Sequence, residues 1–309
     1  MPPCVLVSEP QLSFDREHSL PVRPTLTMPD AISNTVPDAV SNTISEQPAR
    51  PLHILITGAG IGGLTAALAL RQQGHDVAIF EASRLAQETG AAIHLASNAN
   101  GLLRRMGLMV EEIGAVECTG VCEYLPHNNA VKYQMDTSKA AKMWQHPWHL
   151  VHRAHLHTAL KGMATGAAGK GPPAKLHVAS RVQQVDAGTA SLTLEDGSTV
   201  QGDLIIGADG VHSRARSCIP GGDKHPFDSG KSAFRFMIPT EDLKADPRTA
   251  DPVSKLGYLT MWIAEDRRLV MYPCVSNTMM NFVAIHPSKE SEADITGEGG
   301  LFEMQLSRV

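Results

Sequence analysis

The stretch HILITGAGIGGLTAALALRQQGHDVAIFE, residues 53–81, decides the fold of this chain. Its first five residues, His53–Thr57, form a short apolar, β-branched run that ends at a glycine, which predicts a buried parallel strand. Residues 64–73 are rich in Ala and Leu and stop at Gly74, so they predict a helix. A second strand is predicted at Asp76–Phe80, and strand, helix and strand within about 30 residues make a βαβ unit with a right-handed crossover.

The turn between the first strand and the helix carries the pattern GxGxxG at Gly58, Gly60 and Gly63. Gly58 permits a tight turn, Gly60 lets a pyrophosphate approach the backbone, and Gly63 lets helix and strand pack closely. The helix N-terminus adds free N–H groups and a partial positive charge. Glu81 follows the second strand and is expected to accept hydrogen bonds from ribose hydroxyls, while its charge disfavours a 2′-phosphate. This pattern predicts a dinucleotide site without choosing between NAD and FAD.

Further elements follow this unit. Ser97 is predicted to cap a helix over residues 98–106, and residues 155–163 predict another helix. Residues 176–206 alternate as strands do, with a hairpin turn at Asp196-Gly197. The apolar run 204–206 enters a second glycine-rich turn, Gly207-Ala208-Asp209-Gly210. Runs at 233–238, 269–272 and 280–285 predict a mostly antiparallel sheet in a second domain.

The charge balance and the hydropathy pattern narrow the class of protein. The chain of 309 residues has 27 basic and 32 acidic side chains, a net charge of −5, so it lacks the positive field that nucleic-acid binding requires. We therefore expect no nucleic-acid partner. No run of 18 or more apolar residues predicts a transmembrane segment, and no signal peptide is evident. These features lead us to expect a cytoplasmic protein.

Cysteines and histidines raise the question of a metal. The five cysteines form an odd set without disulfide or paired CxxC spacing, which fits a reducing compartment. Five of the 14 histidines crowd into residues 146–157, but their spacing has no HExxH pattern and no nearby acid or thiol completes a ligand set. We therefore predict no metal site. The cysteines are Cys4, Cys118, Cys122, Cys218 and Cys274, and the histidines are His146, His149, His152, His155 and His157.

Several segments taken together resemble one family. The segments are residues 56–70, 90–95, 98–103, 151–156, 202–216, 233–235 and 271–274. Together they resemble the FAD-dependent aromatic-ring monooxygenases (class A flavoprotein hydroxylases), in the salicylate-hydroxylase-like branch that is often found in fungal secondary metabolism. They occur in the order of that family, between residue 51 and about residue 288.

The resemblance implies an α/β fold with two domains. A Rossmann-like FAD-binding domain (GR2-type) would span residues 51–225. A partial substrate domain, built on a mostly antiparallel β-sheet, would span residues 226–309. Residues 1–50 are rich in Pro, Ser, Asn and Thr and poor in apolar side chains, so we expect a disordered tail there.

The resemblance also assigns cofactor contacts. It implies that Glu81 holds the FAD ribose, that the backbone near Ala92 lies along the cofactor, and that Arg153 reaches toward the pyrophosphate or the flavin. A guanidinium fork suits phosphate oxygens, although a surface ion pair is the alternative for Arg153. Asp209 and Gly210 match a second fingerprint, associated with both FAD and NAD(P)H. Taken alone, an Asp-Gly pair is more often only a turn.

The same resemblance points to the reaction. NADH or NADPH would reduce the FAD, and O2 would then be used to hydroxylate a small aromatic substrate. Arg235 matches a substrate-facing arginine that could orient a carboxylate or phenolate, with a structural ion pair as the competing interpretation. Tyr272 and His94 are weaker candidates, and we expect structural roles for both.

The C-terminal part departs from the family. The Gly-Asp segment that holds the ribityl chain of FAD in the family does not occur in residues 288–309. Two hypotheses therefore stay open. The chain is either a C-terminally truncated monooxygenase, helped by a separate chain that carries the missing segment, or a non-catalytic remnant that binds nucleotide or serves as an interaction module.

Overall fold

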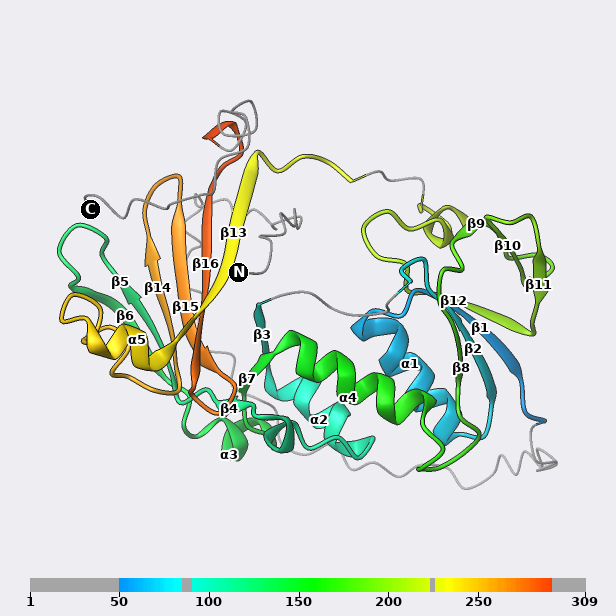
Figure 1. The fold of residues 1–309 in the computed structure, drawn as a ribbon, viewed down its shortest axis with the longest axis horizontal. Helices are drawn as coiled ribbons and strands as arrows, with labels where there is room; N and C mark the ends of the chain where they lie inside the picture. Colours follow the sequence, from blue (N-terminus) through cyan, green and yellow to red (C-terminus); the bar gives the residue numbers. More distant parts are fainter. Residues whose placement is uncertain (1–49, 85–90, 223–225, 291–309) are drawn as a thin grey trace, which may run out of the picture.

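The computed structural model describes residues 50–84, 91–222 and 226–290. Figure 1 shows two lobes, one around a parallel sheet and one around a larger sheet, with helices α1, α2 and α4 between them. The predicted tail at residues 1–49 and the segment after residue 290 lie outside the described residues. None of the helices in the described ranges combines the length and the apolar character that a membrane crossing requires.

A four-stranded parallel sheet forms the first lobe. Its strands are β12 (Leu204–Gly207), β1 (His53–Thr57), β2 (Asp76–Phe80) and β8 (Lys175–His177), in that order. Thr57 of β1 is in register with Phe80 on one side and with Gly207 on the other. The predicted βαβ unit is therefore confirmed, and three strands end together at one edge of the sheet.

Helices cover one face of this sheet, and a small sheet covers the other. Side chains alternate along a strand, so Ile54 and Ile56 pack under the helices while Leu55 packs on the opposite face. The helices are α1 (Ile61–Gln72) and α4 (Arg153–Thr165). The small antiparallel sheet is β11 (Thr199–Gln201), β10 (Ser191–Leu194) and β9 (Val182–Asp186), with the predicted turn at Asp196-Gly197.

Arg71 joins α1 to the C-terminal end of α4. Its side chain is only 1% exposed. Nη1 donates to the carbonyl oxygens of Met163 at 2.6 Å, Ala164 at 3.2 Å and Gly166 at 2.9 Å, and Nη2 donates to that of Gly171 at 3.0 Å. The last carbonyls of a helix have no partner within the helix and carry partial negative charge. A buried guanidinium thus fixes α4 against α1.

The second lobe is a six-stranded sheet. Its order is β13 (Lys231–Pro239), β16 (Met279–Pro287), β15 (Arg268–Cys274), β14 (Tyr258–Ile263), β5 (Gly120–Tyr124) and β6 (Val131–Asp136). The antiparallel pairing of β13, β16, β15 and β14 confirms the mostly antiparallel sheet expected from the sequence. Helix α5 (Thr240–Ala245) packs on one of its faces through Leu243.

One sheet includes strands from both sides of the predicted domain boundary. Strands β5 and β6 belong to the stretch assigned to the FAD-binding domain, residues 51–225, yet β5 pairs in parallel with β14. A cut at residue 225 therefore does not separate the two sheets. The pairing of Gly120 with Tyr258 joins residues that are far apart in sequence, and no local pattern announces it.

A third sheet connects the lobes. It has the order β3 (Ala92–Leu95), β7 (His149–His152) and β4 (Val116–Glu117), and β3 runs into α2 (Ser97–Arg105). Ser97 does not cap this helix, contrary to prediction, because the helix begins one residue earlier than expected and Ala96 occupies the N-cap position. The remaining short elements are η1 (Val110–Ile113), α3 (Ala140–Trp144) and η2 (Ala215–Cys218).

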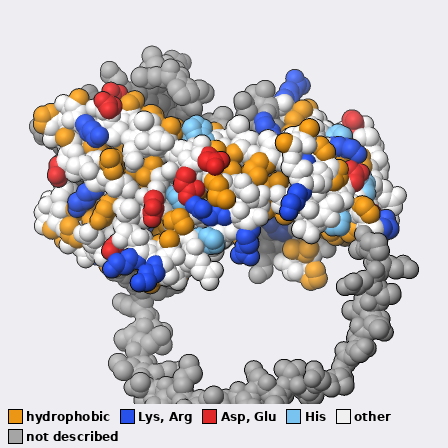
Figure 2. Space-filling model, turned by 90° about the horizontal axis from the view of Figure 1, so that it is seen from below, with side chains coloured by type: hydrophobic (Ala, Val, Ile, Leu, Met, Phe, Trp, Pro, Cys, Tyr) orange, Lys and Arg blue, Asp and Glu red, His pale blue; other side chains and the backbone are white. Residues whose placement is uncertain are grey.

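Surface charges of both signs are mixed. On the face shown in Figure 2, Lys and Arg side chains are interspersed with Asp and Glu.

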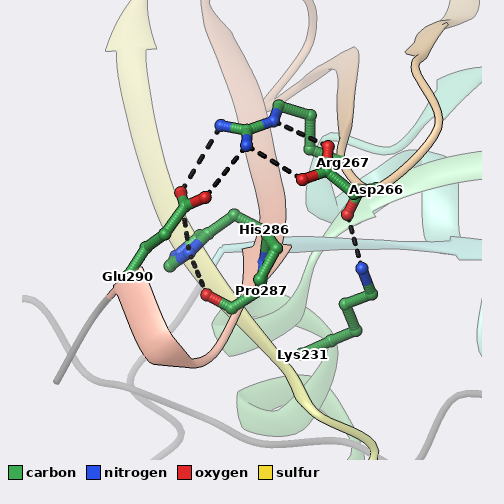
Figure 3. A network of polar contacts seen from close by, with 6 residues as sticks. All are labelled: Lys231, Asp266, Arg267, His286, Pro287 and Glu290. Atoms are coloured by element: carbon green, nitrogen blue, oxygen red, sulfur yellow. Dashed lines mark hydrogen bonds and ion pairs between the residues drawn. The ribbon is translucent and has the colours of Figure 1, made fainter.

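At one end of the six-stranded sheet, Arg267 pairs with both Asp266 and Glu290, and Lys231 donates to the Asp266 carbonyl oxygen (Figure 3). These contacts hold the turn after β16 to the hairpin between β14 and β15.

Candidate functional site

The carboxyl edge of the parallel sheet gathers the predicted nucleotide-binding residues. Three strands of this sheet end in register, and a residue of interest follows each of them directly. Gly58 follows β1, Glu81 follows β2, and Ala208 follows β12. Ligands of open α/β sheets bind in the crevice outside the carboxyl ends of the strands. The first and second fingerprints therefore lie side by side at the edge where a nucleotide is expected.

The three glycines of the first fingerprint have different surroundings. Gly58 has φ of +95°, and a Cβ there would lie 2.5 Å from the Ala208 carbonyl oxygen. A Cβ on Gly63 would lie 2.0 Å from the Gly58 carbonyl oxygen, whereas one on Gly60 would meet nothing within 4 Å. Gly58 and Gly63 are thus required by the turn itself. Gly60 faces open space, where a methyl group would matter only to a bound molecule.

Glu81 reaches back into this turn. Its Oε2 accepts the Ala59 N–H at 2.8 Å, and its Oε1 accepts the Ser83 N–H at 2.7 Å. Each carboxylate oxygen has further acceptor capacity. The carboxylate is therefore held beside the glycine turn and keeps lone pairs that can accept further hydrogen bonds.

Asp209 organises the second turn. Its Oδ2 accepts the Arg214 N–H at 2.7 Å and the Ala215 N–H at 3.2 Å, at the start of η2, and its Oδ1 accepts the Ser213 hydroxyl at 2.5 Å. Gly210 follows with φ of +76°. Asp209 thus shapes the loop, and the loop in turn touches Gly58 through Ala208.

Ala92, at the start of β3, is held by the six-stranded sheet. Its N–H donates to Asn281 Oδ1 at 2.9 Å, and its carbonyl oxygen accepts the Tyr272 hydroxyl at 2.7 Å. Tyr272 is 4% exposed and Asn281 is fully buried. These two bonds dock β3 onto the second lobe. Tyr272 therefore has a structural hydrogen bond, in keeping with our expectation for it.

We expect Tyr272→Phe to lower the free energy of unfolding by about 1–3 kcal/mol, because a buried carbonyl loses its donor. Urea unfolding followed by circular dichroism measures this change. Tyr258→Phe is the matched control, since the Tyr258 hydroxyl only accepts a 3.4 Å bond from exposed Gln134. Equal effects of the two substitutions would contradict a docking role for Tyr272.

Arg153 and Arg235 lie near this junction. The Arg153 N–H donates to the Ala91 carbonyl oxygen at 3.1 Å, at the first turn of α4. Arg235 lies opposite Val283 in the β13–β16 pair. Met237, two residues along and so on the same face, packs in the cluster that contains Ala92. Arg235 is therefore on the sheet face turned toward β3.

The crowded histidines have separate structural contacts. His149 is buried, and its Nδ1 lies 3.0 Å from Asn100 Nδ2 while its Nε2 lies 3.2 Å from Glu111 Oε1. The rings of His152 and His155 meet edge to face at 4.5 Å. Within the described ranges, no group of three or more His, Cys, Asp or Glu side chains could hold a metal ion.

Burial gives His149 a pH-dependent contribution to stability. Desolvation lowers its pKa, and nearby Arg104 adds to this, against the opposing charges of Glu111 and Glu117. The unfolded chain takes up a proton below about pH 6.5 that folded His149 resists. Stability that is present above this pH is therefore lost as the pH falls through the folded pKa.

We accordingly expect His149→Gln to weaken the loss of stability between pH 7 and pH 5. Urea unfolding at several pH values measures it, and the same substitution at exposed His127 is the control. An unchanged pH dependence in His149→Gln would contradict the prediction.

The sequence analysis assigned no role near the nucleotide site to two residues, Asn281 and His157. Asn281 is a lone polar residue inside an apolar strand, which is a signal for a buried hydrogen bond. His157 is 3% exposed, and its Nε2 lies 2.8 Å from the Ala59 carbonyl oxygen in the glycine turn. Its helix neighbours Leu156 and Leu160 are fully buried. The apolar pair at spacing i, i+4 is the sequence signal that could have indicated a buried side of α4 near His157.

A depression of about 460 Å³ lies elsewhere, between α2 and α3. Ser97, Met143, Trp144 and Trp148 are among the residues that line it, and His94 packs against Trp148 with ring centroids 5.5 Å apart. Its lining includes no glycine of either fingerprint. The fingerprint edge thus remains the candidate site.

The sheet order, the glycine turn and the acid at the end of β2 define a Rossmann-like dinucleotide-binding protein. The chain belongs to the family described as FAD binding domain, whose model matches residues 52–297. This match, together with the relatives, confirms the resemblance to FAD-dependent aromatic hydroxylases and the α/β fold class predicted from the sequence.

Relatives carry monooxygenase and hydroxylase names. A protein of Aspergillus candidus named FAD-dependent monooxygenase cfoG is 35% identical over 257 residues, covering 80% of this chain and 58% of that protein. Hispidin-3-hydroxylase of Neonothopanus nambi is 30% identical over 259 residues, covering 78% and 60%. The crystal structure of Klebsiella pneumoniae HpxO with FAD and uric acid has a TM-score of 0.63 at 22% identity, covering 76% and 56%. The chain thus spans less than two thirds of the length of these relatives.

Proposed function

We propose that this chain binds FAD at the edge formed by Gly58, Gly60 and Glu81, as part of a monooxygenase that hydroxylates a small aromatic substrate with O2 and NADPH or NADH. The observation that carries the proposal is the open space at Gly60 beside the fixed carboxylate of Glu81. The relatives named hydroxylases support the substrate class. FAD, when bound, supplies the redox chemistry that activates O2.

The residues at this edge suit the adenine half of FAD. The pyrophosphate would lie against the Gly60 backbone and the first turn of α1, where helical N–H groups lack intrahelical partners. Glu81 would accept hydrogen bonds from the ribose hydroxyls. Gly63 allows α1 to start close to the turn, Asp209 and Gly210 form the adjoining wall, and Arg153 would add positive charge.

The substrate side of the proposal rests on Arg235 and the backbone at Ala92. Arg235 would hold a carboxylate or phenolate and so orient the ring, and β3 would line the cofactor. The relatives are longer than the portion that this chain matches. The corresponding further sequence, on this chain or on a separate one, would complete the flavin half of the FAD site. The net charge of −5 supports a small-molecule substrate rather than nucleic acid. We also propose a cytoplasmic location.

Flavin titration tests the cofactor proposal. Purified chain is mixed with FAD, and quenching of flavin fluorescence gives the dissociation constant. Glu81→Ala is expected to weaken binding about tenfold, as the loss of hydrogen bonds to a charged group implies. Glu195→Ala, at an exposed acid in the turn between β10 and β11, is the matched control.

Two outcomes would count against the proposal. Absence of saturable FAD binding by the wild-type chain would leave the non-catalytic interaction module as the better description. Equal affinities of the wild type and Glu81→Ala would remove Glu81 from the ribose site. Faster reduction of bound FAD by NADPH when an aromatic acid is added would support the hydroxylase function.

A further inference from the structure

Ala59, between the first two glycines of the fingerprint, is held at both of its backbone groups. Its N–H donates to Glu81 Oε2 at 2.8 Å, and its carbonyl oxygen lies 2.8 Å from His157 Nε2. One partner follows β2, and the other belongs to α4, almost one hundred residues further along the chain. The turn is thus fixed from two sides by side chains.

The contact with the Ala59 carbonyl oxygen indicates which ring nitrogen of His157 carries a proton. A carbonyl oxygen only accepts hydrogen bonds, so Nε2 of His157 must carry a proton. The residue is 3% exposed, and Leu156 and Leu160 of the same helix are fully buried, so His157 belongs to the buried side of α4. Little room remains for it to turn away, so the donor is directed at the turn.

Peptide geometry extends the effect to the next residue. The Ala59–Gly60 peptide is trans, since the described residues contain no cis bond. In a planar trans peptide the C=O and the N–H point in opposite directions. Because the Ala59 carbonyl points at His157, the Gly60 N–H points away from α4.

We propose that His157 is a positioning residue for pyrophosphate binding. Its Nε2–H holds the Ala59–Gly60 peptide in the orientation that presents the Gly60 N–H to the phosphates of a bound adenine dinucleotide. The inference rests on the proposed FAD function and assigns to α4 a part in forming the nucleotide site. One member of the histidine cluster is thereby linked to the cofactor rather than to a metal.

The experiment compares two probes on the full chain. ADP carries the adenine, the ribose and the two phosphates, whereas adenosine lacks the phosphates. Isothermal titration calorimetry measures both affinities for the wild type, His157→Leu and His157→Gln. Leu removes the donor, and the Gln amide can supply one near the position of Nε2. His155→Leu is the matched control, because His155 is on the same helix and contacts Ile113 instead.

We expect His157→Leu to weaken ADP binding about tenfold with much less effect on adenosine, because one hydrogen-bond donor that orients a phosphate-binding amide is lost. His157→Gln should recover most of the ADP affinity, and His155→Leu should match the wild type. A structural role alone would not change the ratio of ADP to adenosine affinity. Equal loss for both probes, or no loss of ADP affinity in folded His157→Leu, would overturn the proposal.

A second readout separates this inference from the proposed function. If the wild-type chain binds neither FAD nor ADP, the proposed function fails, and His157 is judged by amide hydrogen exchange of residues 58–63. His157→Leu should speed exchange in this turn, with His157→Gln close to the wild type. Unchanged exchange in His157→Leu would overturn the positioning role independently of any ligand.

Should His157→Leu fail to fold, His157→Gln decides alone: ADP affinity and exchange near those of the wild type support the role, and loss of both overturns it.

Discussion

Gly60→Ala is expected to weaken FAD and ADP binding by about a hundredfold while leaving the fold intact. The added methyl group meets no protein atom within 4 Å, so the folded chain accommodates it. It would occupy the space through which the pyrophosphate approaches the backbone, and each lost hydrogen bond to a charged phosphate costs about 1.5–3 kcal/mol. Calorimetric titration with ADP measures the affinity, and thermal unfolding measures the fold.

Two other glycines serve as controls for Gly60→Ala. Gly162 is exposed in α4, and a Cβ there also meets nothing within 4 Å, so Gly162→Ala should keep the ADP affinity without loss of stability. Gly63→Ala places a Cβ 2.0 Å from the Gly58 carbonyl oxygen and should lower the unfolding temperature. If Gly60→Ala binds ADP as tightly as Gly162→Ala does, the nucleotide does not approach this turn.

Arg71→Met is expected to lower the free energy of unfolding by about 3 kcal/mol. Three carbonyl oxygens at the end of α4, and that of Gly171 further along, lose their donor, although relief from burying a charge offsets part of the cost. Native domains are stable by only about 5–15 kcal/mol, so the loss should be evident in urea unfolding.

Arg105→Met provides the comparison for Arg71→Met. Arg105 is exposed in the last turn of α2, and its removal should change the free energy of unfolding by about 0.5 kcal/mol or less. A loss below about 1 kcal/mol in Arg71→Met would show that water replaces the guanidinium at these carbonyls.

The βαβ unit could be predicted because its signals are local. The glycine turn and Glu81 lie within residues 53–81, and periodicity places each of them at an element end. Parallel strands that neighbour in a sheet then bring Gly58 and Glu81 together. The same logic anticipated the second turn at Asp209, since the apolar strand before it pairs with β1.

The remainder depends on contacts between distant segments. Tyr272 and Asn281 form hydrogen bonds with Ala92, although they lie 180 and 189 residues further along the chain. No spacing rule predicts contacts between residues so far apart in sequence. His157 was visible as one of several histidines, but only the packing of α4 against α1 directs it at Ala59. The Ser97 cap was predicted from residue type, and a one-residue shift of the helix start was enough to make it wrong.

The pairing of β5 with β14 has a consequence for how the chain folds and how it can be divided. The sheet of the second lobe cannot close until residues 120–136 meet residues 258–263, so its formation waits on a large loop closure. A fragment ending at residue 225 would retain β5 and β6 as an unsupported hairpin with an exposed edge, which favours aggregation. The two lobes are therefore interlaced along the sequence, and no single cut of the chain separates one complete sheet from the other.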